Sequence, residues 1–185
     1  MTTRLIALLF CLFTGLSPVL AAGYGYGGSG SKGLNNSTTN QLVRFLERGI
    51  RLCRSLDSVY RYDCYRQNYS SAADKLAGNA AYAVPMMALQ SVEQTLERVV
   101  AQNADPTART VRKRGGTFRA VKPASTAKAK ETFRRALDEA ATVLLRSDEG
   151  AGTHFARIAK ALDSNKILLR AMLRMIGRSP IYMLG

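Results

Sequence analysis

"CRSLDSVYRYDC", residues 53–64, contains two of the three cysteines of the chain, eleven positions apart. In an unbroken helix the Cα atoms of Cys53 and Cys64 would stand roughly 16 Å apart, whereas a disulfide needs them about 5 to 7 Å apart. A disulfide between them therefore requires the helix to end and the chain to turn back. Asp57 is the expected turning point, as an N-cap carboxylate for a second helix. The stretch then predicts an αα-hairpin, with one helix over about 39–56 and the next beginning after Asp57.

The amino terminus indicates the compartment of the chain, and the compartment decides whether its cysteines are oxidised. "MTTRLIALLFCLFTGLSPVLAA", residues 1–22, has Arg4 before an apolar run, then Pro18 and small residues, which is typical of a secretory signal peptide. A membrane-spanning helix needs roughly 20 apolar residues, and this run is shorter. We expect Cys11 to be removed with the signal peptide, and we expect no transmembrane helix in the mature chain.

Three fates remain for the other two cysteines. In an oxidising compartment, one disulfide between Cys53 and Cys64 is the simplest outcome, and a free or intermolecular pair is the second. A metal site is the third, since His154 is the single histidine and zinc sites need more ligands. We predict neither metal nor cofactor. Leu56, Tyr60 and Cys64 also continue the spacing of the preceding helix, so an unbroken helix is the alternative to the hairpin.

The same stretch resembles an element of several bacterial envelope proteins. In those proteins, which include accessory proteins associated with type VI secretion, a cysteine and an aliphatic–aspartate pair precede R-L-x-C-Y-D. The residues that match in kind are Cys53, Leu56, Asp57, Arg61, Cys64 and Tyr65. Tyr62 stands where leucine is usual, and Arg66 stands where aspartate follows the tyrosine. The resemblance covers residues 53–66; it implies an envelope location and a disulfide-stapled hairpin, and no activity.

The remainder of the chain predicts an all-α fold, a small bundle of four or five amphipathic helices. Residues 23–40 are rich in Gly, Ser and Asn and read as a flexible leader. A single helical domain is expected over 41–178, followed by an apolar tail over 179–185. Beyond the hairpin, the apolar periodicity predicts helices over about 82–105, 125–146 and 153–176.

A basic loop is expected at 105–124, between the helices predicted over 82–105 and 125–146. Within it, Gly115 and Gly116 would suit the turn of a β-hairpin. That pairing would place Arg112 opposite Arg119, and like charges directly opposite one another are destabilising. The sequence therefore favours a plain loop.

Positive charge is concentrated in two regions. Loss of Arg4 with the signal peptide leaves 26 basic against 13 acidic residues, a net charge of +13. Residues 109–135 contain ten basic residues against one glutamate, and residues 153–185 contain six against one aspartate. The predicted polyanion-binding residues are Arg109, Arg112, Lys113, Arg114, Arg119, Lys122, Lys166, Arg170, Arg174 and Arg178.

Such a field attracts anionic partners. Behind a signal peptide these are an anionic envelope polymer, a lipid surface or an acidic protein, and export argues against nucleic acid. The alternative for the loop is a solvated surface that only maintains solubility, and for the last helix it is an apolar face that completes the core. Our leading hypothesis is a non-catalytic periplasmic or secreted protein that docks through its basic surface.

A tyrosine cluster and a possible carboxylate pair are two further candidate sites. Tyr62, Tyr65 and Tyr69 share a helix face beside arginines and form a candidate aromatic site, although tyrosines at this spacing more often pack in a core. A small envelope hydrolase acting on cell-wall polymer is the alternative function, and it requires two carboxylates in one cleft near His154 or the tyrosines. No catalytic constellation is complete in the sequence, so catalytic residues are not assigned.

Overall fold

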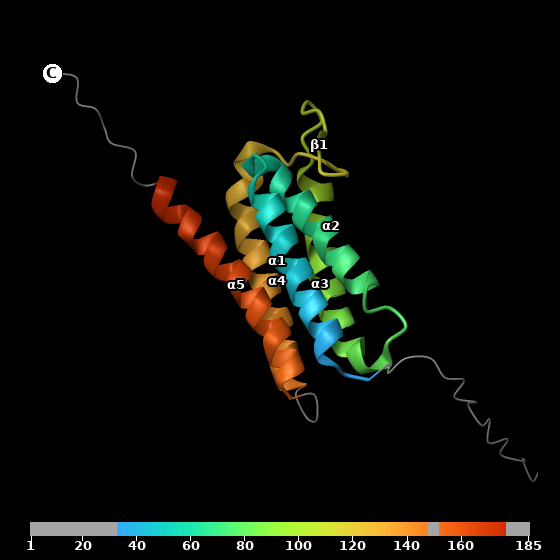
Figure 1. The fold of residues 1–185 in the computed structure, drawn as a ribbon. Coiled ribbons are helices and arrows are strands. Elements are labelled where there is room, and N and C mark those ends of the chain that lie inside the picture. Colours follow the sequence, from blue (N-terminus) through green and yellow to red (C-terminus); the bar gives the residue numbers. More distant parts are fainter. Residues whose placement is uncertain (1–32, 148–151, 177–185) are drawn as a thin grey trace, which may run out of the picture.

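The computed structural model describes residues 33–147 and 152–176, with side chains up to Lys166. Its helices pack side by side as an all-α bundle, and a small β-hairpin projects at one end (Figure 1). The helices are α1 (Asn36–Arg54), α2 (Arg61–Asp74), α3 (Ala83–Asn103), α4 (Thr126–Arg146) and α5 (Thr153–Ile176), with 3-10 turns η1 (Ser58–Tyr60), η2 (Ala80–Tyr82) and η3 (Pro123–Ser125). The predicted signal peptide and the 179–185 tail lie outside the described residues.

The predicted αα-hairpin and its disulfide are confirmed. Cys53, in the last turn of α1, is bonded to Cys64 in the first turn of α2, with their Cα atoms 5.4 Å apart. Both cysteines are buried. The capping role expected of Asp57 is wrong, because its side chain makes no hydrogen bond at the start of η1. Backbone bonds shape the turn instead: the Tyr60 N–H donates to the Asp57 carbonyl at 3.0 Å.

The first helix begins earlier than predicted. Residues 36–40 were assigned to the flexible leader, but they form the first turn of α1. The Asn35 side chain caps this helix by accepting a hydrogen bond from the Thr38 N–H at 2.8 Å, which satisfies one of the free donors at a helix start. Thr39 is completely buried. A polar composition concealed a turn that tertiary contacts hold in place.

The core lies between the faces of all five helices. Helix α2 packs against α1 and α3, α4 packs against α3 and α5, and α1 closes the bundle against α5. At the centre, Tyr65 stacks on Phe133 with ring centroids 4.8 Å apart, and Tyr69 meets the same ring edge-on at 5.8 Å. Aromatic pairs of this kind contribute about 0.5 to 1.5 kcal/mol beyond area burial.

Helices α1 and α2 approach closely at one point. A Cβ atom on Gly49 would overlap the side-chain amide of Asn68, which is itself buried. Glycine is therefore required there by space, although its backbone is ordinary helix.

The basic segment is not a plain loop, which corrects the sequence prediction. Strands β1 (Val111–Lys113) and β2 (Gly116–Phe118) pair antiparallel around a two-residue turn at Arg114 and Gly115. The argument against a hairpin assumed a turn at Gly115 and Gly116, which is one position later than the real turn and shifts the partner of Arg112 by two residues. Arg112 faces Thr117, and Arg119 lies beyond the paired residues.

Candidate polyanion-binding surface

The hairpin is fixed to the bundle by a buried carboxylate. Asp63, which is 1% exposed, accepts the backbone N–H of Arg119 at 2.8 Å and the Arg66 Nε–H at 2.8 Å. The Arg119 guanidinium also lies 3.3 Å from Asp63 and 3.2 Å from Glu97 of α3. Arg66 reaches Glu97 at 3.0 Å. We call these four residues the Asp63 network; it joins α2, α3 and the hairpin.

The charge state of Asp63 follows from its contacts. Burial by itself would raise the pKa of this carboxyl group, because it disfavours the charged form. The Arg119 N–H and the side chains of Arg66 and Arg119 outweigh burial, and the pKa of Asp63 lies below its usual range. Asp63 is therefore an ionised, fully bonded acceptor at neutral pH. Its place in the first turn of α2 also suits the helix dipole.

Four more hydrogen bonds hold the segment that carries the hairpin against the end of α1, η1 and α2. The bonds are Lys113 Nζ to the Ser55 carbonyl (2.7 Å), the Tyr60 hydroxyl to the Arg109 carbonyl (3.0 Å), Gln67 Nε2 to the Thr117 carbonyl (2.8 Å) and the Val121 N–H to the Val59 carbonyl (2.9 Å). An isolated two-stranded hairpin is marginal in water. These contacts give the basic segment a fixed position on the bundle.

The predicted cations of this segment divide into two groups. Arg119 and Lys113 serve the attachment just described, so their charges are already engaged. Arg109, Arg112 and Arg114 are exposed, and none has a carboxylate at ion-pair distance among the described side chains. We call these three the hairpin cations. Lys122 is also exposed and lies in the field of Asp105.

Arg114 has an unusual backbone. Its φ is +47°, and Gly115 follows with a φ of +83°, so both residues of the turn are left-handed. Such turns favour Asn-Gly or Gly-Gly, and the left-handed conformation costs a residue with a Cβ about 1 to 2 kcal/mol. The hairpin thus carries a long cation at the position where local energetics favour glycine or asparagine.

The second predicted basic region is described only at its start. Lys166 forms ion pairs with Asp138 of α4 and, at 3.2 Å, with Asp163, so its charge helps to join α5 to α4. The backbone of α5 continues as a helix to Ile176, but the side chains of Arg170 and Arg174 lie outside the described part, as does Arg178 altogether. The predicted stripe of cations therefore stays a prediction.

The tyrosines do not form an aromatic binding surface. Tyr62, Tyr65 and Tyr69 are 6%, 1% and 0% exposed, and they belong to the core. The Tyr62 hydroxyl donates to the Thr126 carbonyl at 2.8 Å, and Tyr69 accepts from Asn165 at 2.7 Å. Burial raises the pKa of Tyr65 to about 12. The packing interpretation of their spacing is the one the structure supports.

His154 forms a hydrogen bond with Thr39, which is 115 residues away in the sequence. Its Nδ1 lies 2.8 Å from the Thr39 hydroxyl, which lies 2.7 Å from the Tyr82 hydroxyl. Tyr82 in turn donates to the Asn35 carbonyl at 2.8 Å. A hydroxyl beside an imidazole is the start of a nucleophilic site, but Thr39 and Tyr82 are completely buried. The chain of bonds joins α1, η2 and α5.

The carboxylates of the Asp63 network meet around arginines rather than across an open cleft. Among the described residues, a surface hollow of about 300 Å³ lies between α3 and α4 and another of about 200 Å³ lies beside α1, and the linings of these two contain no carboxylate. Within the described side chains, no group of three or more His, Cys, Asp or Glu gathers as metal ligands would. None of the described helices combines the length and apolarity that crossing a membrane demands.

Comparison with other proteins adds no relative. The chain matches no protein-family model, none of the curated proteins and no solved structure.

Proposed function

We propose that this is an exported, non-catalytic docking protein that binds an anionic polymer of the cell envelope through the hairpin cations. The observation that carries the proposal is a strained arginine at the tip of an anchored hairpin. Strain of this kind concentrates at functional positions and persists where the surrounding structure holds it. A segment that served only solubility would need neither the strain nor the buried attachment.

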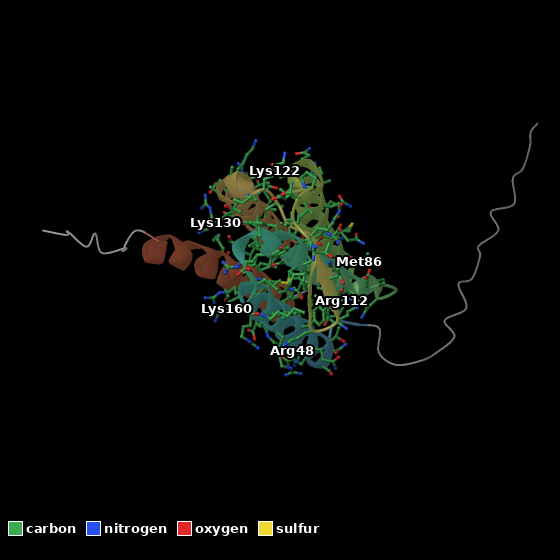
Figure 2. All side chains as sticks on the ribbon, turned by 90° about the horizontal axis from the view of Figure 1, so that it is seen from above. Arg48, Met86, Arg112, Lys122, Lys130 and Lys160 are labelled. Atoms are coloured by element: carbon green, nitrogen blue, oxygen red, sulfur yellow. A yellow bond between two sulfur atoms is a disulfide. The ribbon has the colours of Figure 1, made fainter. Side chains whose placement is uncertain are left out.

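Total positive charge alone does not distinguish this surface. Viewed along the bundle, Arg48, Lys122, Lys130 and Lys160 are distributed around its circumference (Figure 2). The hairpin differs because it projects from the end of the bundle (Figure 1) and because hydrogen bonds to the bundle hold its backbone in one position. Fixed, unpaired charges bind with less loss of conformational entropy than charges on a mobile loop.

The first prediction concerns binding. Replacing Arg109, Arg112 and Arg114 by Gln is expected to release the protein from phosphocellulose at a salt concentration that still retains the unmodified chain. Exposed charges are screened as the Debye length falls from about 10 Å at 0.1 M to about 3 Å at 1 M. Each lost phosphate contact should also lower the slope of log K against log salt by roughly 0.7 to 0.9.

A matched control separates the hairpin from net charge. Arg135, Arg146 and Lys160 are exposed cations of α4 and α5, and replacing them by Gln removes the same charge. We expect this variant to elute close to the unmodified protein. Equal losses of retention in the two variants would mean that only net charge matters, and the proposal would be wrong.

The second prediction is that one substitution at Arg114 raises the stability of the hairpin and lowers its retention on phosphocellulose. Arg114→Asn is expected to stabilise the hairpin by about 1 kcal/mol, since asparagine tolerates a positive φ, and to weaken retention on the same matrix. Arg112→Asn removes the same charge from a strand position, where asparagine is unfavourable, and should lower stability. Hydrogen exchange of the hairpin amides and urea unfolding measure the two effects. A destabilising Arg114→Asn would contradict the strain argument.

A further inference from the structure

A second basic site lies on α1, away from the hairpin. The hollow of about 200 Å³ is lined by Gln41, Arg44, Phe45, Arg48 and Lys75. The first four lie on one face of α1, because they are spaced three, four and seven residues apart. Lys75 reaches the hollow from the end of α2. This site is not evident in the sequence, because its cations come from two segments outside the regions richest in charge.

The three cations of the hollow have no acidic partner in the part of the chain whose side chains are described. Among the described side chains, no carboxylate lies within ion-pair distance of Arg44, Arg48 or Lys75. Like charges one turn apart on a helix repel by a few tenths of a kcal/mol. An anion placed between them would relieve this repulsion and gain charge-assisted hydrogen bonds.

Two contacts position the polar groups of the hollow. The Lys75 ammonium lies over the Phe45 ring, 4.7 Å from its centroid, and this cation–π contact holds the ammonium while leaving its N–H groups able to donate. The Gln41 amide nitrogen donates to Ser37 at 3.1 Å. The Gln41 carbonyl oxygen is left as an acceptor beside the cations.

We propose that this hollow binds a phosphate monoester. Two guanidinium groups can each donate paired hydrogen bonds to phosphate oxygens, and a lysine adds a third charge. The terminal group of a monoester offers three oxygens and up to two negative charges, since its second pKa is about 6. Its protonated form can also donate to the Gln41 carbonyl. A phosphodiester offers one oxygen and one charge fewer, and the small hollow suits a single phosphoryl group rather than an extended polymer.

This site is separate from the surface proposed above. Arg48, the cation of the hollow nearest to Ser55 along α1, precedes it by seven residues, or roughly 10 Å along the helix axis, and Ser55 accepts the bond from Lys113 of the hairpin. Losing the hairpin cations should therefore leave the hollow intact, and the two proposals can fail independently.

The test is a titration of the full mature protein with glycerol 3-phosphate, a soluble monoester, followed by calorimetry and by amide chemical shifts. We expect saturable binding with the largest shifts around residues 41–48 and 75. Arg44→Gln with Arg48→Gln should weaken binding at least tenfold, and Lys75→Gln should weaken it less. Arg135→Gln with Arg146→Gln removes the same charge from exposed helix surface and should change affinity less than twofold.

Vesicles distinguish a lipid source of the same group from a soluble one. Phosphatidic acid presents a monoester, whereas phosphatidylglycerol presents a diester. Binding to phosphatidic acid vesicles that requires Arg44 and Arg48 would place the ligand on a lipid; binding to the soluble monoester alone would place it on a small molecule. Equal binding to both lipids, equal losses in the control variant, or no saturable binding of glycerol 3-phosphate would overturn the proposal.

Discussion

Replacing Asp63 by alanine is expected to destabilise the protein by about 2 to 3 kcal/mol, the usual scale for losing hydrogen bonds to a buried charged group and leaving a donor unsatisfied. The Arg119 N–H would lose its acceptor, whereas the Arg66 guanidinium would keep Glu93 and Glu97 as partners. Since these bonds hold the hairpin, hydrogen exchange at Arg119 and along β2 should accelerate more than exchange in α4. Urea unfolding at neutral pH measures the total loss.

Asp74 offers a control on the same helix. It is exposed at the end of α2 and makes no ion pair with a described side chain. Asp74→Ala should therefore change the free energy of unfolding by less than about 0.5 kcal/mol, as is usual for surface positions. A loss in Asp63→Ala no larger than the loss in Asp74→Ala would remove the central role assigned to the Asp63 network.

The same carboxylate has a pH signature. A group whose pKa is lowered by folding contributes stability above its unfolded pKa, and that stability is lost as pH falls through the folded pKa. The pKa of Asp63 is lowered from an ordinary value of 3.8. The stability difference between the unmodified protein and Asp63→Asn should therefore be constant above about pH 5 and shrink below about pH 4.

Removing the disulfide is expected to cost about 3 kcal/mol. The bond closes a short loop between residues 53 and 64, and the entropy that it removes from the unfolded chain corresponds to roughly that value. Cys53→Ala with Cys64→Ala should lower the free energy of unfolding by this amount. The reduced, unmodified protein should unfold at nearly the same urea concentration as the double variant.

Reductant provides the internal control for this prediction. The double variant has no disulfide to lose, so adding reductant should leave its midpoint unchanged. If the oxidised protein and the double variant unfold at the same midpoint, the helix packing around the cysteines holds the hairpin without the covalent bond, and the prediction is wrong.

Local patterns were sufficient to predict most of the fold. The two cysteines required a turn between helices, and apolar periodicity predicted α3, α4 and α5 within a few residues. The start of α1 was missed because Asn36 to Asn40 are polar, and their helical state depends on contacts between Thr39 and the distant Tyr82 and His154. Apolar periodicity is a local pattern and gives no information on contacts between residues that are distant in sequence.

The composition of the basic segment is evident in the sequence, but its geometry is not. The charge cluster was evident, yet the hairpin was rejected because one assumed register paired two arginines. The role of Asp63 was missed as well, although it sits in the quoted stretch between Tyr62 and Cys64. A carboxylate between two buried neighbours is a signal in itself, since buried acids require partners.

The adjacency of Asp63 and Cys64 links the disulfide to the attachment of the basic hairpin. One residue anchors the hairpin, and the next anchors the preceding helix, so a single turn of α2 serves both attachments. Formation of the Cys53–Cys64 disulfide would therefore stabilise the turn of α2 to which the hairpin is attached. A chain in which Cys53 and Cys64 are still reduced is therefore expected to hold the hairpin less firmly, and hydrogen exchange along β2 should be faster in it than in the oxidised protein.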